Sequence, residues 1–173
     1  AEPGFFVNGS RVLLSESLTG KILRGEASFA NATLLSWLRW RIGGDVNKLL
    51  HLIQLPDMSL RRQSHFRWKR IRGCNICVWR EDYLRVNGFD ESFTGWGHED
   101  ADFVLRLHNA GVQRKNGFCS TEVYHLWHPE SSRSDATSNR ERVTQRIGTG
   151  VIRAKKGVDE AALADDVIVR KFN

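Results

Sequence analysis

The stretch Asn87-Gly-Phe-Asp-Glu-Ser-Phe-Thr-Gly-Trp-Gly-His-Glu-Asp-Ala-Asp102 places a glycine-flanked tryptophan directly before three acidic residues. The apolar run that follows, Phe103-Val-Leu-Arg-Leu107, has the spacing of a helix, and Gly111 is a helix stop. We therefore predict a helix that begins at the acidic residues and carries all three on its first turn.

These acids have both a structural and a chemical interpretation. Acids in the first turn stabilise a helix through its dipole by about 0.3–1 kcal/mol each, and Asp102 can pair with Arg106 four residues later. Helix capping does not need the glycines, however. Gly95 and Gly97 let the backbone turn sharply and leave one face of Trp96 open. A stacking aromatic ring beside fixed carboxylates suits the binding of a sugar.

A longer segment carries a family resemblance. Gly73-Cys-Asn-Ile-Cys-Val-Trp-Arg-Glu-Asp-Tyr-Leu-Arg-Val-Asn-Gly-Phe-Asp-Glu91, followed by Gly95-Trp-Gly-His-Glu-Asp100, resembles the acceptor-side half of GT-A glycosyltransferases. The similar families are the inverting family 2 enzymes and the β-1,4-galactosyltransferases, and the resemblance covers about residues 67–130. It implies that Asp100 is the catalytic base and that Glu99 helps to hold the acceptor sugar.

The same resemblance implies the rest of the site. Trp96, with its neighbours Gly95 and Gly97, would orient the acceptor, and Asn75 would line the same cleft. Arg11 is a separate hypothesis that rests on its position after Gly9-Ser10, from which it would approach the diphosphate of the donor. In metal-dependent GT-A enzymes, a His beyond the strand that follows the acceptor helix binds the donor-bound ion.

The resemblance places that metal ligand in the segment His125-Leu-Trp-His128. His125 is the first choice and His128 the second, because His125 lies where the predicted strand leaves the sheet. Neutral imidazole together with carboxylate and diphosphate oxygens would suit Mn²⁺ or Mg²⁺. In general, a His at a strand end is more often a structural or surface residue than a ligand.

The expected fold class is α/β: the C-terminal part of a Rossmann-like GT-A fold, with a mixed sheet flanked by helices. We expect a single domain over residues 1–173, in which residues 131–173 form a C-terminal extension. The nucleotide-binding half of such enzymes, with its Asp-x-Asp motif at a strand end, is expected to be absent. Asp100-Ala-Asp102 matches that motif in letters, but it lies in the predicted helix, so we interpret it as the base plus a capping acid.

Periodicity and turn residues predict the remaining elements. The predicted strands lie at residues 5–14 around Gly9, at 71–79, at 119–128 and at 167–172. The predicted helices lie at residues 28–40, at 45–55 with Asp45 as the cap, at 80–86 with Asn87 left-handed behind it, and at 137–146.

Composition limits the partners. The net charge of +6 predicts attraction to anions such as nucleotide diphosphates, acidic glycans or a membrane surface. A basic, aromatic-containing segment at residues 61–72 would also suit nucleic acid, but no nucleic-acid motif accompanies it, and we expect none to bind. Cys74-Asn-Ile-Cys77 has the spacing of a zinc motif without a second pair, so we predict small buried thiols.

The predicted function is that of an inverting glycosyltransferase, which transfers a sugar from a nucleotide-diphosphate sugar to a glycan or glycolipid acceptor. From the resemblance we expect a role in bacterial surface polysaccharide synthesis. The sequence has no apolar run of about 18 residues and no visible signal peptide. The family resemblance implies a cytoplasmic protein, peripheral on the inner face of the membrane. The alternative is a non-catalytic carbohydrate-binding or scaffold module that retains only the acceptor pocket.

Overall fold

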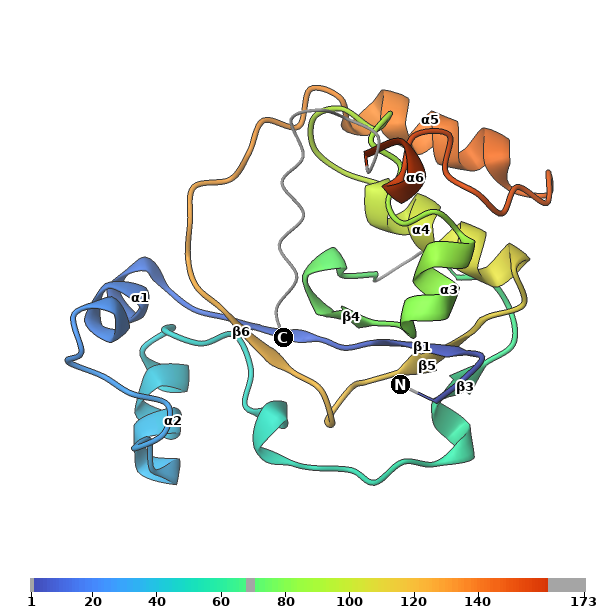
Figure 1. The fold of residues 1–173 in the computed structure, drawn as a ribbon. Helices are drawn as coiled ribbons and strands as arrows, with labels where there is room; N and C mark the ends of the chain where they lie inside the picture. The colour runs from blue at the N-terminus through green and yellow to red at the C-terminus, as the bar shows by residue number, and fades with distance from the viewer. Residues whose placement is uncertain (1, 68–70, 162–173) are drawn as a thin grey trace, which may run out of the picture.

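The computed structural model of the chain describes residues 2–67 and 71–161, and its largest sheet has four strands in the order β3-β5-β1-β4. The strands are β1 (Phe5–Asn8), β3 (Arg62–Gln63), β4 (Ile76–Cys77) and β5 (Gln113–Asn116). β1 is parallel to β5 and antiparallel to β4, so the sheet is mixed (Figure 1). The predicted α/β class with a mixed sheet flanked by helices is confirmed.

A second, two-stranded sheet extends from the first one. In it, β2 (Arg11–Leu13) pairs in parallel with β6 (Val123–His125), and Leu13 lies opposite His125. Gly9 joins β1 to β2, and a Cβ atom there would lie 2.2 Å from both the Asn75 amide nitrogen and the Thr121 carbonyl oxygen. Only glycine fits at this crossing, which carries the chain toward the end of β6.

Three helices lie on one side of the four-stranded sheet (Figure 1). They are α3 (Arg80–Arg85), α4 (Glu99–Asn109) and α5 (Ala136–Arg146), and the short α6 (Val158–Ala161) lies near them. The main core contains Phe6, Ile71, Val86, Phe103, Val104, Leu107, Ala110 and Val112. α4 packs beside β5 and shares this core with Phe6 of β1, which fixes the position of the acidic first turn.

A second apolar cluster holds a smaller helical lobe. It joins β2 to α1 (Glu16–Leu23) and α2 (Leu34–Ile42), and its buried members are Val12, Leu14, Leu18, Trp37 and Val46. Ser15 caps α1 by accepting a hydrogen bond from the Leu18 N–H at 3.0 Å. None of the helices in the described part of the chain is both long and apolar enough to cross a membrane.

Several predicted elements agree with the structure. The strands around Gly9 are present, and α3, α4 and α5 lie where helices were predicted. Asn87 is left-handed behind α3, with φ 61°, and Gly111 is left-handed behind α4, with φ 82°. The predicted strand at residues 167–172 lies outside the described residues.

The helix predicted at residues 45–55 is wrong. Asp45 does not cap a helix, because its carboxylate accepts a hydrogen bond from the Ser15 hydroxyl at 2.5 Å and Val46 bridges to Leu14. Only a 3₁₀ turn, Leu50–Leu52, forms in this segment. The helix predicted at 28–40 begins later, at Leu34, because Thr33 caps it.

The strand predictions at residues 71–79 and 119–128 were too long. A 3₁₀ turn at Gly73–Asn75 replaces the start of the first, and a further 3₁₀ turn lies at Ser59–Arg61. The second strand stops at His125, after which the Trp127 N–H donates to the Thr19 hydroxyl at 2.9 Å.

Two helices, α1 and α6, and two strands, β3 and β5, were not predicted. The β5 sequence, Gln-Arg-Lys-Asn, has no apolar alternation, although this strand lies inside the sheet. Lys115 is buried there because its ammonium group is paired with Glu2 at 2.9 Å and with Asp57 at 2.5 Å.

The cysteine prediction needs a correction. Cys74 and Cys77, predicted to be buried, are exposed: Cys74 lies in the surface turn Gly73–Asn75 and Cys77 in the short strand β4, whereas Cys119 is buried. Within residues 2–67 and 71–161, no group of three or more His, Cys, Asp or Glu side chains converges to hold a metal ion.

Candidate active site

The N-terminal end of α4 borders a hollow of about 440 Å³. The loop before α4 and its first turn contribute one wall, and the segment that leads into β4 contributes another. The lining residues are Arg11, Ile71, Arg72, Gly73, Cys74, Trp96, Gly97, His98, Glu99, Asp100 and Ala101. The structure thus brings Arg11 from β2 to the same hollow as the acids of α4.

Asp100 is held in place from the opposite wall of this hollow. One oxygen of its carboxylate accepts a hydrogen bond from the Gly73 N–H at 3.1 Å. A Cβ atom on Gly73 would lie 3.3 Å from the Asp100 Cβ, so the two walls approach closely here. Asp100 is half-buried, whereas Glu99 beside it is exposed. The carboxylate of Asp100 is therefore both oriented by the backbone and open to the hollow.

The loop before α4 uses left-handed backbone three times. Gly95 has φ 70°, Gly97 has φ 100° and His98, which precedes the helix, has φ 71°. Such values cost a non-glycine residue on the order of 1–2 kcal/mol, so the two glycines permit the sharp turn that the sequence predicted. Trp96 between them remains 43% exposed, and the guanidinium of Arg133 lies 4.8 Å from its ring centroid.

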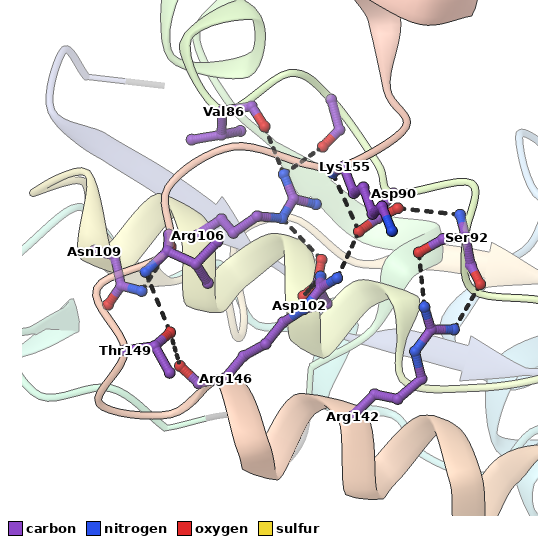
Figure 2. Close-up of polar contacts among 12 residues, drawn as sticks. Val86, Asp90, Ser92, Asp102, Arg106, Asn109, Arg142, Arg146, Thr149 and Lys155 are labelled. Atoms are coloured by element: carbon purple, nitrogen blue, oxygen red, sulfur yellow. Dashed lines mark hydrogen bonds and ion pairs between the residues drawn. The ribbon is translucent and has the colours of Figure 1, made fainter.

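Asp102, two residues after Asp100, is not among the residues that line the hollow, and its side chain lies between Arg106 and Arg146 (Figure 2). It is fully buried and bonds the Arg106 Nε at 2.8 Å and an Arg146 amino group at 2.5 Å. Arg146 also reaches the Asp90 carboxylate at 2.9 Å. The predicted pairing of Asp102 with Arg106 is thus present, and Asp102 is a structural ion-pair residue rather than a capping acid.

Arg106 extends the same buried network to the loop after α3. Its Nη1 donates to the carbonyl oxygens of Val86 at 2.6 Å and Gly88 at 2.7 Å (Figure 2). Burial raises the pKa of Asp90, but hydrogen bonds from Ser92 and the ion pair with Arg146 outweigh it and bring that pKa to about 2. The network therefore joins α4, α5 and the loop at residues 86–92 by buried hydrogen bonds and ion pairs.

A second hollow, of about 450 Å³, adjoins the first. It lies where β6 ends and the chain runs on toward α5, and Arg11 and Trp96 line both hollows. Its lining residues are Arg11, Leu13, Leu14, Trp96, His125, Leu126, Trp127, His128, Glu130, Ser131 and Arg133. Both predicted metal-binding histidines therefore line the hollow next to the one that Glu99 and Asp100 line.

The two imidazoles have the chemistry of metal ligands. Their ring centroids are 5.2 Å apart. Burial, with smaller contributions from Arg11 and His128, lowers the pKa of His125, so its imidazole is neutral near pH 7 and keeps a lone pair. The His128 Nδ1 contacts the Pro129 carbonyl at 2.9 Å, a contact that leaves its Nε2 for a ligand. The pair fits part of a metal site, and further oxygen ligands would have to complete it.

Two predicted site residues line neither hollow. The Asn75 amide donates to the carbonyl oxygens of Ser10, at 2.8 Å, and Thr121, so it fastens the turn between β1 and β2. Gly95 lies against Asp135, whose Oδ2 would be 2.1 Å from a Cβ atom at that position. Asn75 and Gly95 therefore support the surrounding loops and do not line a hollow. The sequence instead predicted both among the residues that hold the acceptor.

Several lining residues were not among the predicted site residues, and they include the charged or aromatic side chains of Arg72, Trp127, Glu130 and Arg133. Trp127 carried a signal in the sequence, because it lies between His125 and His128, and the structure leaves it 43% exposed. Arg72 belongs to the basic segment noted in the sequence. Glu130 and Arg133 come from a polar loop with no pattern of its own, and only the fold brings Arg133 to Trp96.

Comparison with known sequences supports this location. Residues 58–129 match a family described as the N-terminal domain of galactosyltransferase. This segment is similar to glycosyltransferases. The match contains the first turn of α4, β5 and β6, and thus nearly all residues that line the first hollow and both histidines of the second. Because the description names an N-terminal domain, the assignment of this chain to the C-terminal, acceptor-side part of an enzyme stays a prediction.

Two of three similar relatives are sugar transferases by name, and the third is a synthase. Validoxylamine A glucosyltransferase from Streptomyces hygroscopicus subsp. jinggangensis is 43% identical over 56 residues, which are 32% of this chain and 13% of the relative. Chondroitin sulfate synthase 3 of Mus musculus is 31% identical over 87 residues, 47% of this chain and 9% of the relative. β-1,4-Galactosyltransferase 4 of Cricetulus griseus is 38% identical over 52 residues, 29% of this chain and 15% of the relative.

The chain spans between 6% and 15% of the length of these and two further similar relatives. No solved structure matches it significantly. The resemblance to glycosyltransferases that the sequence predicted is thereby confirmed for the central part of the chain.

Proposed function

We propose that this chain forms the acceptor-side part of an inverting glycosyltransferase active site. The donor would be a nucleotide-diphosphate sugar, and the acceptor a hydroxyl group of a glycan or glycolipid. One observation carries the proposal: an oriented carboxylate, Asp100, and a pair of histidines line two adjoining hollows that share Arg11 and Trp96. A carboxylate that could activate the acceptor thus lies next to the side chains of Arg11, His125 and His128, which could bind an anionic leaving group.

Asp100 acts as the general base in this proposal. Its carboxylate accepts the proton of the acceptor hydroxyl as that oxygen attacks the anomeric carbon of the donor. The Gly73 N–H hydrogen bond fixes the carboxylate in the hollow. General-base catalysis of this kind contributes about 10²–10⁴-fold to the rate. Trp96 offers an exposed ring for the apolar face of the sugar, and the exposed Glu99 accepts hydrogen bonds from its hydroxyl groups.

The other hollow is suited to the leaving diphosphate. Arg11 brings positive charge to it, and His125 and His128 bring two imidazole groups. Arg133 lines the same hollow but is paired with Glu130 at 2.8 Å. A divalent ion such as Mn²⁺ or Mg²⁺ would neutralise charge on the diphosphate when bound. The histidines would supply part of its coordination, and diphosphate oxygens or a carboxylate would supply the rest.

The biological setting that we propose is bacterial surface polysaccharide synthesis on the inner side of the cytoplasmic membrane. The supports for it are the resemblance to family 2 enzymes and the similarity to a Streptomyces glucosyltransferase. The net charge of +6 favours anionic donors and anionic surfaces.

A second candidate is a carbohydrate-binding module without catalysis. It is favoured by the observation that no three metal-donor side chains converge within the described residues. Such a module would use Trp96 and Glu99 to bind a glycan, and its affinity would not depend on nucleotide or metal.

Calorimetric titration with UDP, with and without Mn²⁺, separates the two candidates. The transferase proposal predicts metal-dependent binding of UDP that His125→Ala abolishes. His65→Ala is the matched control, because His65 is exposed and lines neither hollow. Glycan binding that ignores Mn²⁺ and UDP, with no UDP binding in the natural full-length protein, would replace the transferase by the binding module.

A further inference from the structure

Helix α2 exposes an apolar face that the protein core does not use. Four of its nine residues are large, apolar and exposed: Leu34 at 65%, Leu35 at 67%, Leu38 at 40% and Ile42 at 86%. Soluble proteins leave single apolar residues at their surface, but a group of them on one helix marks a contact surface.

The four residues form one stripe along the helix. With 3.6 residues per turn, they lie within an arc of about 100°. Trp37 and Trp40 lie on the opposite side and pack into the second core cluster, so the stripe faces away from the protein. Arg41 borders the stripe on one side and Arg39 on the other, both exposed. We call this surface, made of Leu34, Leu35, Leu38, Arg39, Arg41 and Ile42, the α2 face.

The charge next to the stripe is positive. The α2 sequence, Leu-Leu-Ser-Trp-Leu-Arg-Trp-Arg-Ile, contains no acidic residue. Beside the helix, Lys21 and Arg39 line a polar hollow of about 570 Å³ together with Glu26 and Asp45. The Glu26 carboxylate pairs with Arg24 at 2.6 Å, and that of Asp45 accepts the Ser15 hydroxyl at 2.5 Å, so neither acid pairs with the arginines of the α2 face.

We propose that the α2 face binds the surface of an anionic lipid bilayer. An apolar stripe bordered by arginines is the pattern of a helix that lies in the membrane interface. The leucine and isoleucine side chains would enter the boundary between headgroups and acyl chains. The arginine stems would lie along it while their guanidinium groups reach anionic headgroups. This inference does not depend on the proposed transfer reaction, because none of these residues lines the two hollows of the candidate active site.

Co-sedimentation with lipid vesicles tests the proposal. The full chain is mixed with vesicles of phosphatidylcholine, either alone or mixed with phosphatidylglycerol, and the bound fraction is measured against lipid concentration. We expect binding to the mixed vesicles that weakens at high salt. The double variant Leu35→Glu/Ile42→Glu should lower the affinity roughly tenfold or more. Arg39→Gln/Arg41→Gln should remove most of the preference for anionic vesicles, since each Lys or Arg near an anionic membrane surface adds a similar electrostatic attraction to it.

The matched control is Leu60→Glu, which places the same charge at another leucine, 88% exposed, outside the α2 face. Circular dichroism checks that each variant is folded. No sedimentation of the wild-type chain, equal binding to both kinds of vesicle, or an equal loss in Leu60→Glu would overturn the proposal. So would a dimer in light scattering that Leu35→Glu/Ile42→Glu dissociates, because the α2 face would then join two copies of the chain.

Discussion

Asp100 and Asp102 lie two residues apart on the first turn of α4 and have opposite surroundings. Asp100 faces a hollow and accepts one backbone hydrogen bond, whereas Asp102 is buried between two arginines. The i,i+4 spacing predicted the bond from Asp102 to Arg106. The bond to Arg146 could not be predicted, because 44 residues separate the partners and only the packing of α5 on α4 brings them together.

Asp102→Asn should destabilise the protein strongly. The substitution keeps the size of the side chain but leaves the buried Arg106 guanidinium without its carboxylate. Removing one partner of a buried ion pair costs about 3–5 kcal/mol. Urea unfolding followed by tryptophan fluorescence measures the loss. The comparison is Glu26→Gln, which removes one partner of the exposed Arg24–Glu26 pair and should leave the unfolding midpoint nearly unchanged. Equal midpoints for the two variants would contradict the structural role of Asp102.

Asp90 should make the protein sensitive to acid. Its pKa falls from an ordinary value of 3.8 to about 2 in the folded protein. A carboxylate whose folded pKa is lowered stabilises the fold above its unfolded pKa, and that contribution is lost as the pH falls through the folded pKa. The free energy of unfolding should therefore decrease between about pH 4 and pH 2.

The pH dependence of urea unfolding in wild type and Asp90→Asn measures this contribution. The variant should be less stable than wild type at pH 6, and its stability should change less between pH 4 and pH 2. Parallel profiles over this range would show that Asp90 does not supply the acid sensitivity.

At the scale of elements, the loop before α4 depends on backbone conformation and close packing together. Gly95→Ala would introduce a Cβ atom 2.1 Å from the Asp135 carboxylate, at a φ of 70°. We expect a displaced Trp96, weaker glycan binding and a loss of stability. Gly111→Ala is the matched control, because its φ is 82° but the space around it is open, so it carries only the backbone cost of about 1–2 kcal/mol.

The double variant Gly95→Ala/Asp135→Ala separates these two costs. Removing the Asp135 carboxylate should recover the part of the stability that the clash removes and leave only the backbone cost. Thermal unfolding and glycan titration of the single and double variants provide the measurement. A Gly95→Ala variant that is no less stable than Gly111→Ala would contradict the close packing of this loop.

Local signals decided which elements could be predicted. The helices at residues 80–85, 99–109 and 136–146 have polar or acidic starts and helical spacing, so their positions followed from the sequence. The segment at residues 45–55 also had a cap and a helix stop. There, the bond of Asp45 to Ser15 and the bridge of Val46 to Leu14 prevailed over local preference.

At the scale of the whole molecule, the site depends on two parallel strand pairs, β1 with β5 and β2 with β6, which no local sequence pattern predicts. β5 is a polar strand next to β1, and its buried Lys115 is neutralised by Glu2 and Asp57 from distant parts of the chain. The parallel pairing of β2 with β6 places Arg11 near His125. The acids and the histidines were predictable as motifs. Their placement on adjoining hollows, with Arg133 over Trp96, required the fold.

The measurement that tests the central claim most directly is the turnover of Asp100→Asn in the natural full-length protein. A sugar-transfer assay with the wild-type enzyme as reference gives kcat, and urea unfolding shows whether stability is kept. Glu141→Gln, an exposed acid on α5, is the matched control. We predict that Asp100→Asn lowers kcat by about 10²–10⁴-fold with unchanged unfolding, as expected for loss of a general base, and that Glu141→Gln lowers neither. Near wild-type turnover in a folded Asp100→Asn variant would contradict the assignment of Asp100 as the base.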